Sequence, residues 1–590
     1  MRSGLLQVET GVLVIGSGGA GLRAAIAASD AGADVTVLTK GRFGLDGATV
    51  AAQADMAVDS ASCARDFGLP GDTADSPDLF MEDMTVEGEY LNDPALVKRH
   101  VEDAPKQLWD IVSWGAVPRE LVHTPGHRYP RGVWIPGPDL ARILREQFQK
   151  RGIPVREHHW ATRLVAWGGA VRGALAVDAA TGGQVFFRSR AVVLATGGAS
   201  RVYPFSTGSE YLTGDGLSMA FEAGAELADM EFPMFLPYAL LSPEAVRGVP
   251  FTHDVTNYLD AWALNRAGDR YMRRWDAVRL ERTTRDINAV AAGVEILEGR
   301  GSPSGGTWLS LAHLPANLIA ESGRWFPESL RNWRSGRIDL SVVLPDLSRD
   351  AVETVPAAHF TNGGIRIDEN GSTCVPGLFA AGEGTAGIHG ANRVSGNAIT
   401  QIFVWGTRSG ESAASFARDA GYGACDTALV ENLAAQDCKH LERTDGPCPM
   451  ELCRSIRRTA WEKAGVVRDG ESLAEAIAEA DTLRAMVQSQ AVRTKRRVLS
   501  REWGHALSNV HMVRVLELTA RAAQARKESR GAHYRRDFPE TDDGAWLVRL
   551  ILRKQAEGGV DIRLEDAGTG ALSPAPGVRP YGKKGSRHGR

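Results

Sequence analysis

A basic side chain is held among glycines in the stretch HGANRVSGN, residues 389–397. Arg393 stands between Gly390 and Gly396, in a composition from which neither a regular helix nor a strand gains much. Glycine lets a backbone turn sharply and come close to a ligand, and a guanidinium offers a carboxylate two parallel hydrogen bonds. These residue types suit the binding of a small acid, although the stretch alone does not identify one.

A second glycine-rich stretch, GSGGAG at residues 16–21, has the GxGxxG spacing of a nucleotide-binding turn. Around this turn, the apolar run 12–15 predicts a buried strand before it, an alanine-rich helix follows it, and residues 34–39 predict a second strand. In such a βαβ unit the backbone and the helix N-terminus both favour a pyrophosphate. A merely tight turn is the alternative, but the strand–turn–helix–strand context favours a bound dinucleotide.

The acid that usually holds a ribose hydroxyl about 20 residues after such a turn is missing. The second strand ends instead in Thr39 and Lys40. The hydroxyl of Thr39 is therefore the candidate contact to the ribose.

Three later stretches place polar residues where strands end or glycines turn. The strand at 188–195 leads into Thr196 and Gly197, Asp215 lies in a glycine turn before a helix, and an apolar run ends at Glu383. Each could be a plain strand terminus on its own. Together with GSGGAG, the segments ATGG, TGDG, PGLFAAGE and HGANRVSGNAI resemble the flavoprotein subunits of succinate dehydrogenase and fumarate reductase, with L-aspartate oxidase as a close relative.

The resemblance extends from about residue 12 to about residue 543 and implies an α/β fold. A Rossmann-like FAD-binding domain of the glutathione-reductase type would be interrupted by an α+β capping domain and followed by a C-terminal helical domain. The tail from 571 onward is rich in proline, glycine and basic residues, so we expect it to be mobile, and a contact with a partner subunit is the alternative. The expected bounds are 8–232 and 346–412 for the FAD-binding domain, 233–345 for the capping domain, 413–545 for the helical domain and 546–590 for a C-terminal segment and tail.

The cofactor that the resemblance implies is FAD. Many relatives attach it through a histidine in a segment similar to GATVAAQAD, residues 47–55, where this chain has Ala48. An alanine cannot form that bond, so we expect noncovalent FAD and a lower flavin potential, which makes succinate oxidation harder and reduction or oxygen-coupled chemistry easier. The residues expected at the FAD site are Gly16, Ser17, Gly18, Gly19, Ala20, Gly21, Thr39, Lys40, Ala48, Thr49, Gln53, Thr196, Gly197, Asp215, Glu383, Asn397, Ala398 and Ile399.

Removing hydrogen from a CH–CH bond, or adding it to a C=C bond, needs a hydride carrier, a proton donor or acceptor, and fixed cations that hold carboxylates. Taken alone, Arg285 would be a surface arginine and His359 a structural histidine. The resemblance instead assigns Arg285 to move the proton, and His359 and Arg393 to bind the substrate. A guanidinium is a poor acid in water, so this role of Arg285 requires a buried, carboxylate-coupled setting.

The segment 229–241 departs from the pattern. Relatives that act on dicarboxylates usually have Gln-Phe-His-Pro-Thr here, whereas this chain has MFLPY at 234–238, so Leu236 replaces a carboxylate-binding histidine. The family's Thr-Glu pair falls on His253 and Asp254. Asp254 would then be the catalytic proton-relay carboxylate and His253 a substrate ligand that replaces the lost contact. The alternative is that the distal half of the pocket accepts a less anionic group.

Length and composition bound these inferences. A chain of 590 residues exceeds the roughly 250–300 residues at which one core stops growing, so several domains are expected. A net charge of -4 without a basic stripe argues against nucleic acid as a partner. The six cysteines lack the spacing of a zinc or iron-sulfur site, so no metal is expected and electrons would pass through a separate partner. The resemblance implies that this partner is an iron-sulfur subunit.

Neither a cleavable signal nor an uncharged apolar run of about 18 residues is evident, which predicts no transmembrane segment. We therefore expect a cytoplasmic protein, held at the inner face of the membrane if its partner subunit is located there.

Three functions remain open at this point. The first is an FAD-dependent oxidoreductase of the fumarate reductase/succinate dehydrogenase type, which moves a hydride between flavin N5 and a CH–CH or C=C bond of a carboxylate substrate, with Arg285 as proton shuttle. The second is an L-aspartate oxidase-like or adenylylsulfate reductase-like flavoenzyme. The third is a non-catalytic flavin-binding subunit, against which the joint presence of Arg285, His359 and Arg393 argues.

Overall fold

The main sheet sets three parallel strands side by side at the core. The computed structural model describes residues 5–52, 55–118, 120–251, 256, 259–319, 344–569 and 572–583. In it β1 (Leu6–Ile15) lies between β2 (Val35–Leu38) and β9 (Gly183–Leu194), and its apolar half is completely buried. The outer strands of this sheet are β6 (Val155–Arg156), β16 (Leu378–Ala380), β8 (Ala170–Asp178) and β7 (His159–Trp167).

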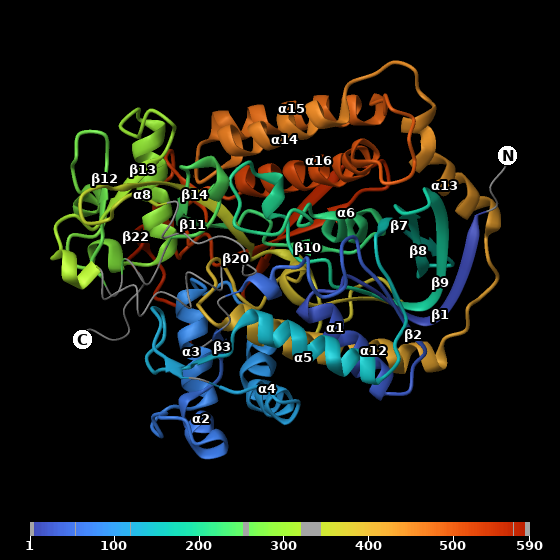
Figure 1. Ribbon diagram of the computed structural model, residues 1–590, viewed down its shortest axis with the longest axis horizontal. Coiled ribbons are helices and arrows are strands. Elements are labelled where there is room, and N and C mark those ends of the chain that lie inside the picture. Colours follow the sequence, from blue (N-terminus) through green and yellow to red (C-terminus); the bar gives the residue numbers. More distant parts are fainter. Residues whose placement is uncertain are drawn as a thin grey trace.

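Two helices pack tightly against each other beside this sheet. Helix α1 (Gly19–Asp30) follows β1, so the expected βαβ unit is confirmed, and α12 (Asn397–Asp419) lies along it (Figure 1). A Cβ atom at Gly410 of α12 would lie only 2.3 Å from the backbone oxygen of Ala24, so this contact requires glycine. Helix α5 (Gly137–Lys150) also contacts α1. The N-termini of α1 and α12 are thereby brought close to the same end of the main sheet.

A small antiparallel sheet lies beside the start of α12. Its central strand β5 (Gly132–Trp134) pairs with β4 (Leu121–Val122) and with β3 (Asp55–Ala57). The Ala57 N–H donates to the Gly396 oxygen at 3.3 Å, which fixes β3 against the loop before α12. The helices around this sheet are α2 (Ser60–Phe67), α3 (Pro77–Glu87) and α4 (Pro94–Ser113).

A second antiparallel sheet forms a separate layer, at the left in Figure 1. Its order is β11 (Pro233–Leu240), β14 (Val352–Thr361), β13 (Thr307–Ser310) and β12 (Trp262–Leu264), and α8 (Arg285–Leu297) packs on β11. An apolar cluster around Tyr238, Met272 and Leu309 gives this layer its own core. The short 3-10 turns here are η3 (Glu244–Val246), η4 (Tyr271–Arg274) and η5 (Leu280–Arg282).

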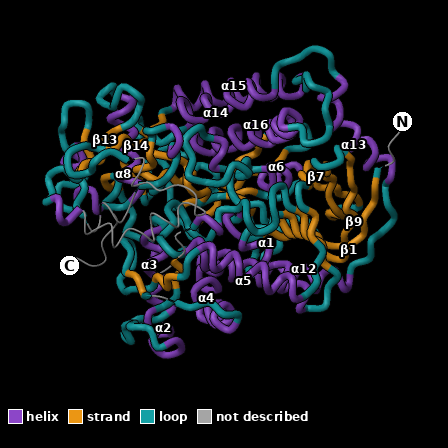
Figure 2. Tube along the Cα trace, in the orientation of Figure 1, coloured by secondary structure: helices purple, strands orange, loops and turns teal. Residues whose placement is uncertain are grey.

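Long helices dominate the chain after α12, as Figure 2 shows by colour. Helices α14 (Pro449–Ala464), α15 (Gly470–Ser489) and α16 (Arg501–Ala525) contact one another, and α13 (Thr427–Glu442) leads to them beside β7 and β8. None of the described helices is long and apolar enough to cross a membrane. The bounds of the four expected domains stay predictions.

The C-terminal tail differs from expectation. Residues 572–583 are ordered, because β22 (Val578–Pro580) pairs with β19 (Glu540–Asp542) and the Tyr581 hydroxyl donates to the Gly531 oxygen at 2.7 Å. Arg579 adds an ion pair to Asp543 at 2.6 Å. The expected mobility is therefore wrong for these residues, because long-range contacts outweigh a composition that favours disorder.

Shorter elements complete the fold. Strand β20 (Val548–Lys554) pairs with β21 (Val560–Asp566) and with β10 (Leu227–Ala228), which joins the C-terminal segment to the rest of the chain. The other short elements are η1 (Thr49–Ala51), η2 (Ser200–Val202), α6 (Asp215–Glu222), β15 (Gly364–Ile365), η6 (Gly382–Gly384), β17 (Val467–Arg468) and β18 (Tyr534–Arg535).

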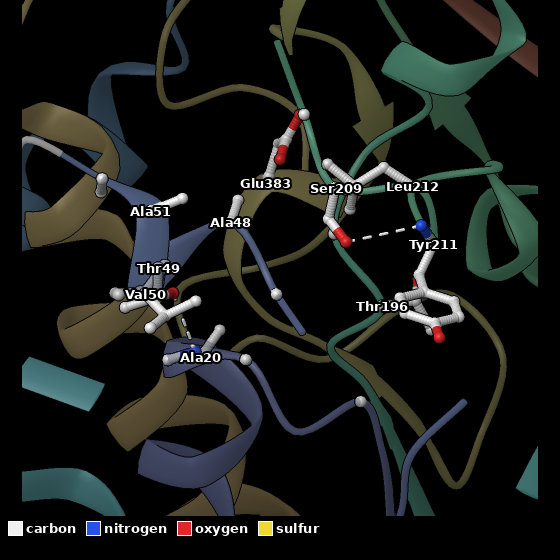
Figure 3. Close-up of a pocket in the computed structure, with 18 of the residues that line it drawn as sticks. Ala20, Ala48, Thr49, Val50, Ala51, Thr196, Ser209, Tyr211, Leu212 and Glu383 are labelled. Carbon is white, nitrogen blue, oxygen red and sulfur yellow. Dashed lines mark hydrogen bonds between the residues drawn. The ribbon is translucent and has the colours of Figure 1, made fainter. Parts of the chain in front are cut away.

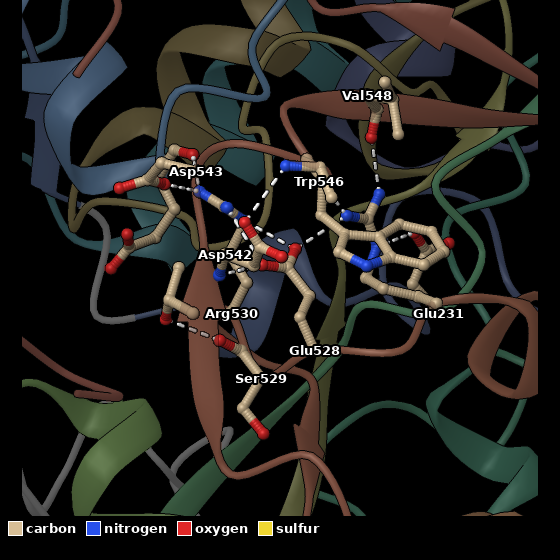
Figure 4. Close-up of polar contacts among 12 residues, drawn as sticks. Glu231, Glu528, Ser529, Arg530, Asp542, Asp543, Trp546 and Val548 are labelled. Atoms are coloured by element: carbon tan, nitrogen blue, oxygen red, sulfur yellow. Dashed lines mark hydrogen bonds and ion pairs between the residues drawn. The ribbon is translucent and has the colours of Figure 1, made fainter. Parts of the chain in front are cut away.

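A buried ion network fastens the end of α16 to this segment (Figure 4). Arg526 pairs with Glu231 and with Glu528, each at 2.8 Å, and Arg530 pairs with Glu528 at 2.7 Å and with Asp543 at 2.9 Å. All of these side chains are at most 2% exposed. Because each buried charge has an opposite partner, the cost of removing it from water is offset within the chain.

Candidate active site

A single cavity of about 940 Å³ joins most of the residues that the sequence singles out. Figure 3 shows Ala48 and Thr49 on one side of it, Ser209 and Leu212 on the other, and Glu383 at one end. Gln53 lies outside the described residues, and Gly21 and Asn397 do not line the cavity. The expected FAD-site residues on its wall are Gly16, Ser17, Gly18, Gly19, Ala20, Thr39, Lys40, Ala48, Thr49, Thr196, Gly197, Asp215, Glu383, Ala398 and Ile399.

Gly21 and Asn397, which do not line the cavity, affect the site through packing and hydrogen bonding. A Cβ atom at Gly21 would lie 1.9 Å from the Gly16 oxygen, so this glycine allows α1 to approach the turn. Asn397 is fully buried at the first position of α12, where its Oδ1 lies 2.9 Å from His100 Nε2. Both residues therefore shape the site without facing the cavity.

The glycine turn fits the pyrophosphate of a dinucleotide. Gly16 has a φ of 116°, and a Cβ atom there would lie 2.1 Å from the Ala195 oxygen, so other residues would be strained. A Cβ atom at Gly18 would meet nothing within 4 Å. Helices α1 and α12 both begin at the cavity, and neither N-cap residue caps its helix with a side chain. The Gly19 N–H donates to Thr49 Oγ1 at 3.0 Å, and the positive end of each helix suits an anion. These features fit bound FAD.

The ribose end of the cavity is polar. Ser17 Oγ donates to Thr39 Oγ1 at 2.8 Å, which places the Thr39 hydroxyl on the cavity wall. Lys40 pairs with Asp215 at 2.7 Å. Burial opposes the charge of Asp215, but the charge of Lys40 and hydrogen bonds hold the pKa of Asp215 below its usual value. Asp215 therefore stays ionised, and its ion pair with Lys40 fixes both side chains at this wall.

Glu383 lines the cavity, and burial affects its pKa more than its hydrogen bonds do. The Thr361 N–H donates to Glu383 Oε1 at 3.1 Å. Burial nevertheless raises the pKa of Glu383 to about 7. This carboxyl group changes its charge near neutral pH.

Three candidate substrate residues reach the cavity from three different elements. Arg285 is the first residue of α8, His359 lies in β14, and Arg393 lies in the loop before α12. Arg393 Nη2 is 3.5 Å from His359 Nε2, and His359 Nδ1 is 2.7 Å from Thr207 Oγ1. Because a guanidinium can only donate, this geometry favours a neutral His359 that carries its proton on Nδ1. The structure thus brings together the three residues that the resemblance selected.

Both guanidiniums lie at the cavity without a carboxylate partner among the described residues. No acid in that part of the chain comes within 4 Å of a side-chain nitrogen of Arg285 or Arg393. Arg285 Nη1 lies 3.9 Å from the Met234 sulfur, and Arg393 is 6% exposed above the ring of Phe360. This contrasts with the buried arginines of the network in Figure 4, each of which is paired.

The pKa values of Arg285 and Arg393 are both below the ordinary value of a guanidinium. Burial, with the charge of Arg285 as a second cause, lowers the pKa of Arg393 to about 9. Burial also lowers the pKa of Arg285, against the opposing effect of Asp55 and Asp286. A positive charge that is buried and unpaired attracts an anion strongly, because a ligand carboxylate offsets the cost of its burial.

Apolar side chains also line the cavity, and Leu236 pairs with Ala357, two residues before His359 in β14. Leu236 lines the cavity and is 3% exposed, so the substitution of the usual histidine falls at the site itself. Pro250 lines the cavity as well. His253 and Asp254 lie outside the described residues, and their roles stay predictions.

Asp55 is an acid on the cavity wall that no sequence motif marks. It is the first residue of β3, and the Ser395 hydroxyl donates to its Oδ2 at 3.2 Å. The available signal was an acid at the end of GATVAAQAD, but only the pairing of β3 and its contact with the α12 loop place that acid beside Arg285 and Arg393. Among the described residues no group of His, Cys, Asp and Glu could hold a metal ion.

Comparisons with known proteins agree with this geometry. An FAD binding domain family matches residues 11–399, and a fumarate reductase flavoprotein C-terminal family matches residues 453–581. The chain is 35% identical over 559 residues to a subunit of the fumarate reductase (CoM/CoB) of Methanothermobacter marburgensis, covering 93% of this chain and 98% of the relative. It is 29% identical over 579 residues to L-aspartate oxidase of Streptomyces coelicolor, covering 95% and 94%.

A solved structure supports the same assignment. Mycobacterium smegmatis Sdh1 in complex with UQ1 superimposes with a TM-score of 0.85 at 30% identity, and 95% of each chain is covered. The resemblance and the fold class expected from the sequence are confirmed.

Proposed function

Because the chain belongs to the family of fumarate reductase and succinate dehydrogenase flavoproteins, we propose that its cavity exchanges hydrogen with the carbon–carbon bond of a carboxylate substrate, with Arg285 as proton shuttle. The observation that carries this proposal is that Arg285 and Arg393, two guanidiniums without a carboxylate partner among the described residues, share the cavity that also holds the dinucleotide turn.

FAD, when bound, accepts or supplies the hydride. The turn at 16–20, the N-terminus of α12 and Thr39 would hold it through noncovalent contacts, because Ala48 offers no atom for a covalent link. The rest of the chemistry is assigned to side chains of the chain itself.

Arg393 and His359 bind a carboxylate of the substrate. The planar guanidinium provides a two-pronged contact, and the ring of Phe360 beneath it restricts its orientation. His359 is held by Thr207 and faces the same carboxylate. This fixes the substrate so that the reacting carbons occupy one position in the cavity.

Arg285 exchanges the proton with the substrate carbon. Burial lowers its pKa, which makes the guanidinium a stronger acid than it is in water. Asp286 and Asp55 stabilise the charged form, so the side chain is protonated before the reaction. Asp254 is the proposed relay carboxylate.

A partner protein carries the electrons. The relative from Methanothermobacter marburgensis is named as one subunit of its enzyme, and Sdh1 was solved in complex with UQ1. We infer that an iron-sulfur subunit is the partner of this chain, at the inner face of the membrane.

Two measurements test the proposal. Acid precipitation should release all flavin into the supernatant, whereas flavin that stays on the polypeptide would contradict noncovalent binding. The FAD-bound protein should then reduce an unsaturated carboxylate with a reduced dye, or oxidise the saturated acid with an oxidised dye. If the flavoprotein shows neither reaction with any mono- or dicarboxylate, the proposed function is wrong.

A further inference from the structure

Asp55 introduces a negative charge at the substrate end of the cavity. Its side chain lines the cavity together with Arg285, Arg393 and Ser395. Oδ2 accepts the Ser395 hydroxyl at 3.2 Å, while Oδ1 has no hydrogen-bond partner among the described residues. A Cβ atom at Gly396 would lie 3.2 Å from Oδ2, so the carboxylate is fixed against the loop that carries Arg393.

The charge of Asp55 acts on both guanidiniums. It is the largest of the charges that raise the pKa of Arg285, and it also raises the pKa of Arg393. Yet no ion pair within 4 Å forms between Asp55 and either arginine. The three groups therefore surround a space in which a ligand feels all three charges.

This arrangement supplies attraction for one carboxylate. When a substrate carboxylate binds Arg393, the positive charge that the described residues leave beside it is that of Arg285, and Asp55 offsets it. A second carboxylate would then gain little attraction, and Leu236 on the cavity wall offers it no hydrogen-bond donor. The desolvation of that second carboxylate would not be offset by the described residues.

We propose that Asp55 is a specificity-determining residue that, together with the apolar wall at Leu236, restricts the site to substrates with a single carboxylate. Asp55 opposes a second negative charge, and the apolar side chain of Leu236 on the cavity wall suits an apolar group of the substrate. The substrate class is a 2-enoate or its saturated counterpart whose far end is apolar. This inference rests on the proposed function and deepens it.

Matched pairs of ligands test the inference without turnover. Crotonate has the carbon skeleton and double bond of fumarate with a methyl group in place of one carboxylate, and butyrate has the same relation to succinate. The full-length, FAD-bound protein is titrated with each acid while the flavin absorbance is followed. We expect crotonate and butyrate to bind at least ~10-fold more tightly than fumarate and succinate. A tenfold difference in affinity corresponds to about 1.4 kcal/mol of binding free energy.

Three variants locate the cause. In Asp55→Asn the preference for crotonate over fumarate should fall by at least ~10-fold, or reverse, because the opposing charge is gone. Asp55→Glu keeps the charge and should keep the preference. Asp66→Asn removes one exposed carboxylate from α2 and should leave the ratio unchanged. Because each result is a ratio of two affinities in one protein, a general effect on the flavin cancels.

The outcomes separate the inference from the proposed function. Wild-type protein that binds fumarate as tightly as crotonate overturns the inference and leaves the proposed function standing. An unchanged ratio in Asp55→Asn also overturns it, because the selectivity would then have another origin. If none of the four acids perturbs the flavin and none is turned over, both proposals fail.

Discussion

Replacement of Arg285 by glutamine should separate catalysis from binding. The proposed role of Arg285 is needed only while the proton moves, so Arg285→Gln should lower kcat by at least ~10²-fold, the low end for general acid–base catalysis. That loss corresponds to about 2.7 kcal/mol of transition-state stabilisation. The dissociation constant of the substrate should change far less.

The structure explains why binding survives this change. Arg285 forms no ion pair within 4 Å among the described residues, and its side-chain contact there is the Met234 sulfur, so its removal leaves no described carboxylate unpaired. The charge of Arg285 also lowers the pKa of Arg393. Without this repulsion Arg393 holds its proton more firmly and still binds the carboxylate.

The assay uses the purified, FAD-bound variant. The absorbance of the oxidised flavin is titrated with whichever acid binds the wild type, and turnover is then measured with the same acid and a dye. Arg282→Gln is the matched control, because Arg282 lies three residues earlier, is exposed, and pairs with Asp260 at 3.3 Å on the surface. It should retain the wild-type kcat.

Two results would refute the reasoning. Near-normal turnover of Arg285→Gln would remove Arg285 from the mechanism, and the site would then serve another reaction. A loss of substrate binding as large as the loss of kcat would make Arg285 a binding residue, in which case the proton comes from another group.

Three further changes give distinct outcomes. Arg393→Lys loses the two-pronged contact to the carboxylate, so KM should rise roughly 10-fold to 100-fold, the equivalent of a charged hydrogen bond of about 1.5–3 kcal/mol; an unchanged KM in steady-state assays would contradict it. Burial raises the pKa of Glu383 to about 7, so the folded state binds this proton more tightly than the unfolded state does. The free energy of unfolding should therefore fall as the pH rises from about 4.5 to about 7. Glu383→Gln should lessen this fall by on the order of 1–3 kcal/mol in denaturant titrations, and an identical pH profile would refute the assignment. Arg530→Met leaves Glu528 and Asp543 short of a buried partner and should cost about 3–5 kcal/mol. Thermal unfolding should show a lower Tm than for Arg563→Met at the surface, and equal Tm values would count against the network.

Local patterns made the core of the fold predictable. The strand, glycine turn, helix and second strand at 12–39 depend on apolar periodicity and on backbone freedom, both of which are visible in a short window. The spacing of the motif also predicts that its third glycine lets the helix approach the strand. In the structure Gly16 has a positive φ at the cavity, and Gly21 allows α1 to pack against the turn, as this spacing predicts.

Contacts between distant segments explain the features that the sequence did not predict. The composition of the tail predicts disorder, but Arg579 reaches Glu89 at 2.6 Å and Tyr581 packs on Tyr534 with ring centroids 5.1 Å apart. Asp55 likewise carries no motif, and its place depends on the pairing of β3 and on the α12 loop. Arg285 and His359 were assigned through the resemblance, because an isolated arginine or histidine gives no signal of its own.

Two pairs of arginines in this chain differ in what offsets their charge. Arg526 and Arg530 have carboxylates within 3 Å, so folding itself offsets their desolvation. Arg285 and Arg393 lack such partners among the described residues, and burial lowers the pKa of each. The unfavourable energy of the buried Arg393 charge is relieved when a carboxylate binds to it. Part of the affinity for the substrate carboxylate is therefore stored in the folded protein, which is why a ligand that binds there should also stabilise it.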